Sequence, residues 1–266
     1  MEVRRIRGWT RACGCGLVAA LAVAATGCGG SSAKSGSGGT LTVDAASSLI
    51  NAFGQLKTTF ERQHPGWKVV LNLAASDDLE AQVEAGQKAD VFAAASPKST
   101  TALQAKHLLG PTKSFATNTL VLAVPADNPA HVTTVQSLVG SHASVVVAAP
   151  GVPLGSYTLE VLGNLGIAPS KLHIVSQETD AETVLAQLTT GAADAGFVYV
   201  TDALSAGGKV KQIMLPANAD ATAVYPIGVI SGSSNAKAAQ WWVDLVLSST
   251  GQSVLRKLGF GTPPSS

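Results

Sequence analysis

The sequence predicts an α/β fold in which mostly parallel sheets are flanked by helices. From residue 40 onward, short apolar runs alternate with segments whose apolar residues recur every three or four positions. Helical segments therefore precede and follow the apolar runs along the chain, which is typical of strands in a sheet covered on both faces. The 266-residue chain is long enough to form two lobes of about 110 residues each in this part.

The predicted elements up to residue 106 are three strands, each followed by a helix. In the first helix Leu49, Phe53, Leu56 and Phe60 follow helical spacing, and Pro65 stands just beyond its end. The strands are expected at residues 41–43, 67–74 and 89–95, and the helices at 48–63, 78–85 and 99–106.

The remaining elements continue the alternation to the C-terminus. Strands are expected at residues 120–124, 144–148, 173–175, 195–200, 210–215 and 224–230. Helices are expected at 157–165, where Gly166 provides a stop, at 181–190, and over one long final stretch from about 235 to 258. No fixed-period repeat is visible in the sequence.

The charge content excludes nucleic acid as a partner. Charged residues make up 13% of the chain and the formal net charge is +1, whereas a nucleic-acid binder needs a basic excess to displace phosphate counterions. Four of the 18 basic residues and one of the 17 acidic residues lie within residues 1–28. Without that segment the chain is slightly acidic, so gross charge does not attract the ligand.

The N-terminus predicts an exported lipoprotein. A basic stretch containing four arginines precedes the apolar run 17–25, which is too short to span a bilayer. The run ends at Ala25-Thr26-Gly27-Cys28, which resembles a bacterial lipobox, although a signal peptide with a chance cysteine is the alternative. We therefore expect a signal peptide at 1–27 and a lipidated Cys28 with a Gly/Ser tether at 28–39. These features predict an extracytoplasmic protein anchored to the cell membrane.

Cysteine usage restricts the chemistry of the folded part. The three cysteines, Cys13, Cys15 and Cys28, all lie in or at the end of the leader. Disulfides and cysteine-ligated metal sites are therefore excluded from the mature domain.

Four predicted strand-to-helix turns present the chemistry of anion binding. They lie at residues 45–48, 75–78, 151–156 and 178–181. A helix N-terminus carries partial positive charge and unpaired N–H groups, so it binds an oxyanion without lysine or arginine. The alternative is ordinary N-capping, since serine and aspartate at these positions also stabilise helices. A binding role requires the turns to converge, which composition does not show.

Six stretches of the chain carry a resemblance to a known family. They are LTVDAASSL at 41–49, LEAQVEAGQKADVFAAA at 79–95, VPLGSY at 152–157, VLAQLTTGAADAGFVYVTDA at 184–203, YPI at 225–227 and LGF at 258–260. In this order and spacing the chain resembles the molybdate-binding proteins of ABC importers, the ModA type. The resemblance implies the type II periplasmic-binding-protein fold, with lobe 1 at 40–121 plus 225–266 and lobe 2 at 122–224. The ligand would bind in the cleft between the lobes.

The resemblance also implies five ligand contacts. Ser48 and Ser76 would donate their hydroxyls and backbone N–H groups, Leu154 and Ala181 would donate backbone N–H groups, and Tyr199 would donate its phenolic O–H. Molybdenum would be bound as its oxyanion, with no residue acting as a direct metal ligand and no other cofactor.

By the same resemblance, the protein would be a monomeric receptor that captures molybdate and also tungstate. It would deliver the anion to a membrane permease that is energised by an ATPase. The alternative is a receptor for another tetrahedral oxyanion, such as sulfate, thiosulfate or phosphate. An exported hydrolase is a different class, but the chain has no G-x-S-x-G, H-E-x-x-H or G-x-x-x-x-G-K-[ST] motif, so we expect no enzyme.

Two carboxylates depart from the family pattern. Asp44 stands where an aromatic or hydroxyl residue is common, and we expect it to point to solvent or to contact the other lobe. Asp77 follows Ser76 where a serine is usual, and we expect it to cap its helix with the side chain turned outward. A carboxylate close to a dianion would otherwise repel it.

Overall fold

The computed structural model describes residues 38–264, all of which belong to one compact unit. The predicted signal peptide, Cys28 and the tether up to residue 37 lie outside these residues. Gly39, the last residue of the predicted tether, is already the first residue of a strand. Within 38–264, no helix has both the length and the apolar character needed to cross a membrane.

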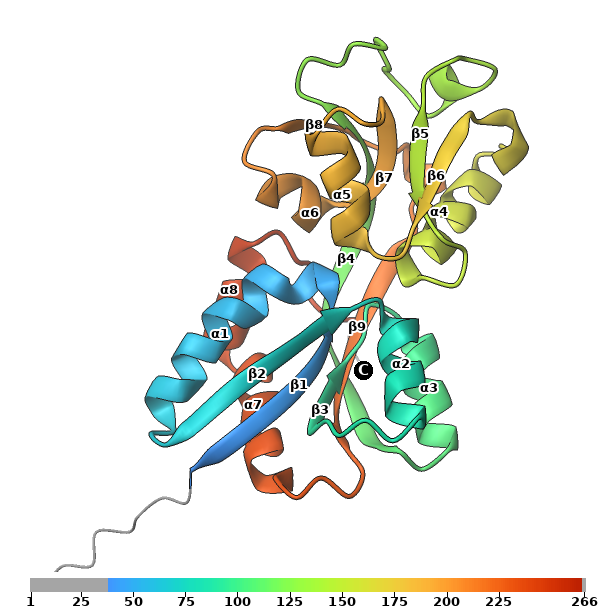
Figure 1. Ribbon diagram of the computed structural model, residues 1–266. Coiled ribbons are helices and arrows are strands. Elements are labelled where there is room, and N and C mark those ends of the chain that lie inside the picture. Colours follow the sequence, from blue (N-terminus) through green and yellow to red (C-terminus); the bar gives the residue numbers. More distant parts are fainter. Residues whose placement is uncertain (1–37, 265–266) are drawn as a thin grey trace, which may run out of the picture. The chain divides into compact units, whose positions relative to one another are not determined.

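Nine strands form one continuous hydrogen-bonded sheet in the described part of the chain (Figure 1). They are β1 (Gly39–Ala46), β2 (Trp67–Ala74), β3 (Val91–Ala93), β4 (Leu109–Pro125), β5 (Val145–Ala148), β6 (Ile174–Glu178), β7 (Ala195–Tyr199), β8 (Val210–Ile213) and β9 (Thr222–Ile230). The strand order is β2-β1-β3-β9-β4-β7-β5-β6, with β8 paired to β4. The predicted α/β class is confirmed.

Eight α-helices accompany these strands between residues 38 and 264. They are α1 (Ile50–Gln63), α2 (Ser76–Glu84), α3 (Pro97–Ala105), α4 (Pro153–Asn164), α5 (Ala181–Thr189), α6 (Val200–Ser205), α7 (Ala236–Leu247) and α8 (Ser249–Lys257). Short 3-10 turns occur at Ser47–Leu49, Gln136–Leu138, Pro169–Lys171 and Ala217–Ala219.

Strands β4 and β9 join two groups of elements. Their antiparallel pairing extends along residues 109–119 of β4, and residues 120–125 of β4 pair instead with β7 and β8. We call β1, β2, β3, α1, α2, α3, α7 and α8 the first lobe, and β5 to β8 with α4, α5 and α6 the second lobe. The predicted lobe borders, 121/122 and 224/225, fall inside the two joining strands, and the exact division stays a prediction.

Each lobe contains parallel pairs, and the joining strands supply the antiparallel ones. The pairs β1–β2, β1–β3, β5–β6 and β5–β7 are parallel. All antiparallel pairs among the named strands involve β4 or β9. In a parallel pair the strands end at the same edge of the sheet, so the helices that follow β1 and β2 begin near one another.

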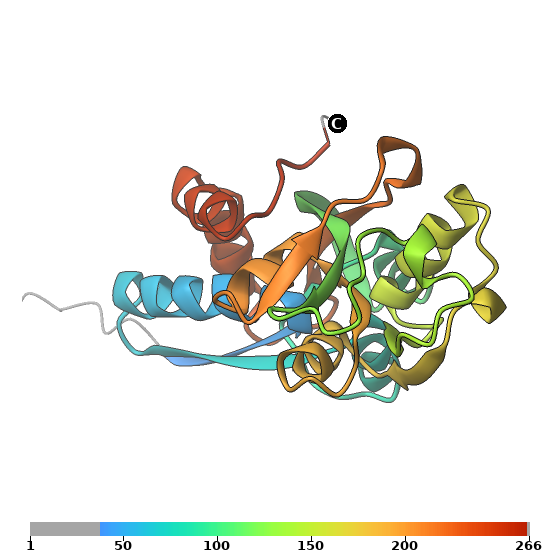
Figure 2. The ribbon, with the colours of Figure 1, turned by 90° about the horizontal axis from the view of Figure 1, so that it is seen from above.

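Helices cover both faces of the first lobe's sheet. On one face, the rings of Phe53 in α1 and Trp242 in α7 meet edge to face, with centroids 5.3 Å apart, and Phe60 packs on Trp242 in the same way. Seen from above, α1 and the C-terminal helices lie on the same side of β1 and β2 (Figure 2). On the other face, a smaller cluster that includes Leu79 and Leu103 holds α2 and α3 to the sheet.

The structure departs from the predicted elements at three places. The strand expected at 120–124 begins at Leu109, because Pro111, polar residues and two register shifts obscure its alternation. The helix α6 was not predicted, since it has six residues and follows β7 directly. The single helix expected at 235–258 is two helices, because Ser248 adopts ψ 164° and caps α8 by accepting from the N–H of Gly251 at 3.2 Å.

Helix α4 is held in place by a close approach at its first turn. Gly155 packs so tightly on the preceding turn that an added Cβ would overlap the carbonyl oxygen of Ala149. Gly163, in the last turn of the same helix, has open space around it. The first turn of α4 therefore depends on glycine at position 155 alone.

We predict opposite effects for the two glycine-to-alanine substitutions in α4. Gly155→Ala should lower the free energy of unfolding by about 1–3 kcal/mol, because the methyl group must displace backbone. Gly163→Ala should leave it unchanged or raise it by up to about 1 kcal/mol, because alanine favours the helix and meets nothing. Urea denaturation of both variants measures this, and equal effects would contradict the packing described.

Candidate functional site

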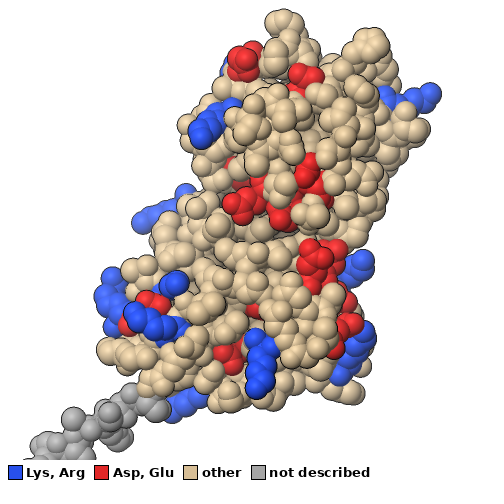
Figure 3. Space-filling view, in the orientation of Figure 1, with Lys and Arg blue, Asp and Glu red and all other residues tan. Residues whose placement is uncertain are grey.

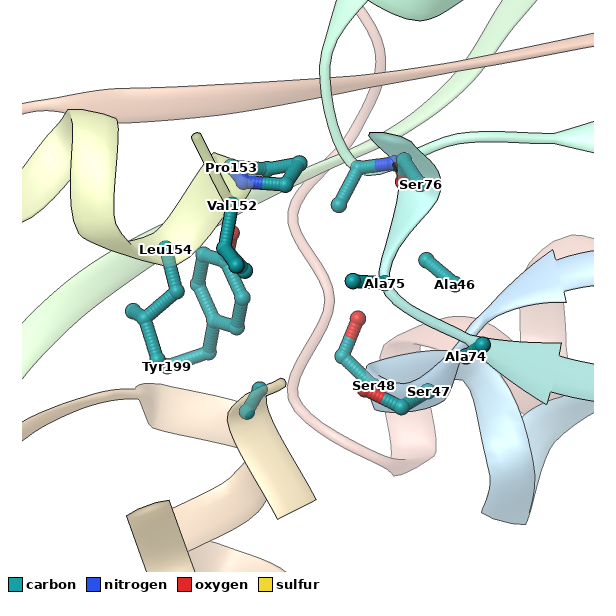
Figure 4. A pocket seen from close by; sticks show the side chains of 12 residues that line it. Ala46, Ser47, Ser48, Ala74, Ala75, Ser76, Val152, Pro153, Leu154 and Tyr199 are labelled. Atoms are coloured by element: carbon teal, nitrogen blue, oxygen red, sulfur yellow. Dashed lines mark hydrogen bonds between the residues drawn. The ribbon is translucent and has the colours of Figure 1, made fainter. Parts of the chain in front are cut away.

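One small pocket between the lobes brings together all five residues expected to contact the ligand. It is lined by Ala46, Ser47, Ser48, Ala74, Ala75, Ser76, Ala95, Val152, Pro153, Leu154, Ala181 and Tyr199. Ser48 and Ser76 come from the first lobe and face Leu154 and Tyr199 of the second (Figure 4). The empty volume of about 210 Å³ includes space open to solvent, so it is an upper bound on the size of the cavity. The pocket therefore suits a small ion.

Helix N-termini converge on this pocket. Ser76 and Ala181 are the first residues of α2 and α5, and Leu154 is the second residue of α4. The first N–H groups of a helix have no partner within the helix, and the aligned peptide dipoles place partial positive charge there. Three such ends around one space form an anion site without any basic side chain.

The capping pattern distinguishes a binding role from helix stabilisation. The residues that precede α2 and α4, Ala75 and Val152, make no side-chain capping hydrogen bond. Only α5 has a conventional cap among the three, since Asp180 accepts from the N–H of Thr183 at 2.8 Å. The N-capping alternative therefore does not account for the starts of α2 and α4.

Both serines of the pocket are buried and held by hydrogen bonds. Ser48 lies in the 3-10 turn after β1, and its Oγ is 3.0 Å from the phenolic oxygen of Tyr225. Ser76 Oγ accepts from the backbone N–H of Ala95 at 3.0 Å. Ser48 is thus held by a residue outside the pocket lining, and Ser76 by the backbone of a lining residue.

Tyr199 presents a phenol with no partner. Its side chain is 1% exposed, and its hydroxyl has no hydrogen-bond partner within residues 38–264. Burial raises the pKa of this phenol well above its ordinary value, and the neighbouring Tyr225 raises it further. The hydroxyl therefore stays protonated and able to donate. A buried polar group without a partner is costly, so its presence in a pocket wall indicates a ligand that accepts from it.

A buried carboxyl lies directly behind Tyr199. Asp202 in α6 accepts from the backbone N–H of Tyr199 at 3.3 Å. Burial raises the pKa of Asp202 to about 7, this backbone hydrogen bond lowers it, and Glu182 and Asp180 raise it further. Much of the Asp202 population is therefore uncharged at neutral pH, which reduces its repulsion of an anion.

No basic side chain among the described residues lines the pocket, and basic side chains do not gather between the lobes on the face shown in Figure 3. None of the twelve lining residues is charged. On the face shown in Figure 3, acidic side chains gather near the level where the lobes meet and basic ones lie mostly toward the periphery. Within the pocket, attraction for an anion comes from the helix ends and the hydroxyls.

Comparisons with known proteins agree with this geometry. Residues 41–261 match the family model described as bacterial extracellular solute-binding protein. The chain belongs to this family. It is 37% identical over 256 residues to the molybdate-binding protein ModA of Mycobacterium tuberculosis, covering 93% of this chain and 97% of the relative. The ModA protein of Haemophilus influenzae is 32% identical over 205 residues, covering 74% of this chain and 80% of the relative.

A solved structure shows the same fold. The periplasmic molybdate-binding protein of Azotobacter vinelandii superposes with a TM-score of 0.76 at 24% identity, covering 84% of this chain and all of that one. The two lobes joined by β4 and β9 therefore form the type II periplasmic-binding-protein fold, as the resemblance implied.

In this solute-binding protein, Asp44 takes neither of its predicted positions. Its side chain is fully buried within the first lobe, where its Oδ1 accepts from Asn72 Nδ2 at 3.0 Å. Its Oδ2 has no partner among the described residues. Burial raises the pKa of Asp44 to about 6, the hydrogen bond from Asn72 lowers it, and Asp90 raises it. Asp44 is therefore a structural carboxyl outside the pocket lining.

The capping role predicted for Asp77 is wrong. Asp77 is the second residue of α2, the cap position is occupied by Ala75, and no side-chain capping bond is formed. Its Oδ1 is buried without a partner in the described structure. Its Oδ2 would lie only 3.3 Å from a Cβ placed on Gly151 of the second lobe. Asp77 thus lies between the lobes but does not line the pocket.

Sequence reasoning missed the residues that support Ser48. Tyr225 was part of the YPI motif but received no ligand role, and Asn118 and Thr201 were not singled out. Tyr225 and Asn118 lie far from Ser48 in the sequence, on β9 and β4, and only the pairing of these strands brings them to the pocket. Polar residues inside otherwise apolar strands were the available signal.

We predict that Asp44→Asn stabilises the solute-binding protein in a pH-dependent way. Because the pKa is raised in the folded state, charged Asp44 opposes folding above pH 6, and that opposition disappears as the pH falls from 6 toward 4. The variant should gain up to about 3 kcal/mol of unfolding free energy at pH 8 and almost none near pH 4. Urea denaturation across this range, with the exposed Asp127→Asn as control, tests the prediction. A gain that does not depend on pH would contradict it.

Proposed function

We propose that this solute-binding protein is the extracytoplasmic receptor of an ABC importer, and that it captures molybdate, and also tungstate, in the pocket between its lobes. The observation that carries the proposal is the buried, unpartnered hydroxyl of Tyr199 in the wall of a pocket that has helix N-termini but no charged side chain. The ModA names of the relatives in Mycobacterium and Haemophilus support the same ligand.

The donor set fits a fully deprotonated tetrahedral dianion. Molybdate at neutral pH has four oxygens and no proton, so it only accepts hydrogen bonds. Ser48, Ser76 and Tyr199 offer hydroxyls, and the starts of α2, α4 and α5 offer backbone N–H groups. Hydrogen bonds to a charged acceptor are the stronger ones, so a neutral site can hold a dianion.

The alternative oxyanions differ in how well their hydrogen-bonding groups match the donors of this pocket. Hydrogenphosphate carries a proton and needs an acceptor, yet no carboxylate lines the pocket, and Asp44 and Asp77 both lie outside the lining. Sulfate and thiosulfate are acceptors like molybdate, so cavity size must separate them. The pocket chemistry therefore favours molybdate and tungstate over phosphate and leaves sulfate to be separated by experiment.

Delivery would follow from the two-lobed arrangement. Ser48 and Ser76 belong to the first lobe, and Leu154, Ala181 and Tyr199 belong to the second. A ligand that contacts both groups at once stabilises the closed arrangement of the lobes. A permease powered by its ATPase would then recognise the closed monomer. We include in the proposal export by the 1–27 leader and anchoring through a lipidated Cys28, with no catalytic activity.

We predict that Tyr199→Phe separates binding from stability. Loss of a hydrogen bond to a charged ligand should weaken molybdate binding by about 1.5–3 kcal/mol, roughly 10-fold to 150-fold. The free protein should be as stable as the parent or more stable, because the substitution removes a buried hydroxyl that has no partner. Isothermal calorimetry with molybdate and thermal unfolding without ligand measure the two effects.

The same calorimetry tests the proposed function itself. The parent should bind molybdate and tungstate at micromolar concentration or below, and sulfate and phosphate should compete only at much higher concentration. Preferred binding of sulfate or phosphate would replace the ligand assignment. A Tyr199→Phe variant that binds molybdate like the parent would show that the anion does not contact this phenol.

A further inference from the structure

A chain of buried hydrogen bonds leads from the joining strands to Ser48. Asn118 Nδ2 lies 3.4 Å from the phenolic oxygen of Tyr225, and that oxygen lies 3.0 Å from Ser48 Oγ. Asn118 Nδ2 also donates to Thr201 Oγ1 at 2.8 Å. Asn118 and Tyr225 are 2% and 0% exposed. The chain therefore connects a residue of the pocket to both β4 and β9, and through Thr201 to the second lobe.

The side-chain amide of Asn118 determines which group donates and which accepts in this chain of hydrogen bonds. Asn118 Oδ1 accepts from the backbone N–H of Thr119 at 3.1 Å, so the other side of the amide must be the NH2 group. Tyr225 then accepts from Asn118 and keeps its own single proton to donate. Burial raises the pKa of the Tyr225 phenol above its ordinary range, so this proton is retained.

The bound anion decides where the remaining protons point. An acceptor-only ligand in the pocket takes the proton of Ser48. Ser48 Oγ then has a free lone pair, and Tyr225 is the donor that reaches it. In this arrangement every proton from Asn118 to the ligand has an acceptor. The reverse arrangement would turn the phenol proton away from Ser48 and leave the ligand facing the lone pairs of the Ser48 oxygen.

The Ser76 hydroxyl is also oriented as a donor toward the pocket, but by a different neighbour. Its Oγ already accepts from the N–H of Ala95, so its proton is also free for the pocket. The two serines are thus oriented as donors by different neighbours, a phenol in one case and a backbone amide in the other. This difference supplies a matched control, because a substitution at Tyr225 should affect Ser48 and leave Ser76 unchanged.

We propose that Tyr225, held by Asn118, is a positioning and specificity-determining residue that orients the Ser48 hydroxyl as a donor to the bound oxyanion. The proposal rests on the proposed function, since it requires an anion in this pocket. Because each serine oxygen already accepts one hydrogen bond and turns its proton toward the pocket, an oxyanion that carries a proton finds fewer acceptors there than one that carries none. Tyr225 thereby disfavours protonated oxyanions relative to fully deprotonated ones, without touching the ligand.

The test is a double-mutant cycle on molybdate binding. Tyr225→Phe removes only the hydroxyl, and Asn118 keeps its bond to Thr201, so the fold should persist. Binding should weaken about fivefold to tenfold in the parent, the range of one neutral hydrogen bond. It should weaken by the same factor in a Ser76→Ala background and by less than twofold in a Ser48→Ala background. Circular dichroism and thermal unfolding of each free variant control for folding.

Selectivity gives a second readout that a loosened structure would not produce. In Tyr225→Phe the freed lone pair of Ser48 can accept from a protonated ligand. The ratio of the phosphate to the molybdate dissociation constant, measured by competition, should therefore fall, while the sulfate-to-molybdate ratio stays unchanged. Equal weakening for all three anions would overturn the proposed specificity role.

The outcomes distinguish this proposal from the one on which it rests. A parent that binds no molybdate overturns the proposed function and the Tyr225 role together. A parent that binds molybdate while Tyr225→Phe binds it equally well overturns only the Tyr225 role. Equal losses from Tyr225→Phe in the Ser48→Ala and Ser76→Ala backgrounds would also overturn it, because the phenol would then not act through Ser48.

Discussion

The pocket depends on one constraint: the helices α2, α4 and α5 must all begin beside it, so that their unpaired N–H groups point into the same space. The arrangement of the strands provides this. Parallel strands end at a common edge, which brings the helices that follow them together within a lobe. The joining strands β4 and β9 then set the two lobes against each other. Alanine and valine at the cap positions of α2 and α4 leave the amides uncovered, where a conventional cap would have satisfied them.

This requirement also explains where the structure tolerates unfavourable groups. Three of the four buried side-chain polar atoms without a partner, among residues 38–264, belong to Asp44, Asp77 and Tyr199. Tyr199 faces the pocket, Asp77 lies between the lobes, and Asp44 is in the strand that leads to Ser48. Such groups are costly in a folded protein, and their concentration near a functional site is expected when binding rather than stability has shaped it.

Much of this could be predicted from the sequence, and the exceptions have physical causes. Apolar periodicity located most strands and helices, and the family resemblance supplied the five residues proposed to contact the ligand, all of which line the pocket. The first half of β4 was missed because bulges and polar residues disrupt its alternation, and the break at Ser248 because one serine redirects the backbone. The Tyr225–Ser48 contact spans 177 residues, and no local pattern encodes a separation of that kind. The position of Asp77 likewise depends on the other lobe, not on its own helix.

The small side chains around the pocket have a further consequence. Five of the twelve lining residues are alanines, and Leu154 and Ala181 are expected to meet the ligand through their backbone. The size of the cavity is then set by how closely polypeptide segments approach one another, so the ionic radius that fits is a property of the whole fold. Exchanging one lining side chain for another of similar size should change that radius little. To accept a larger or smaller anion, the protein would need a different spacing between the helices whose first residues line the pocket.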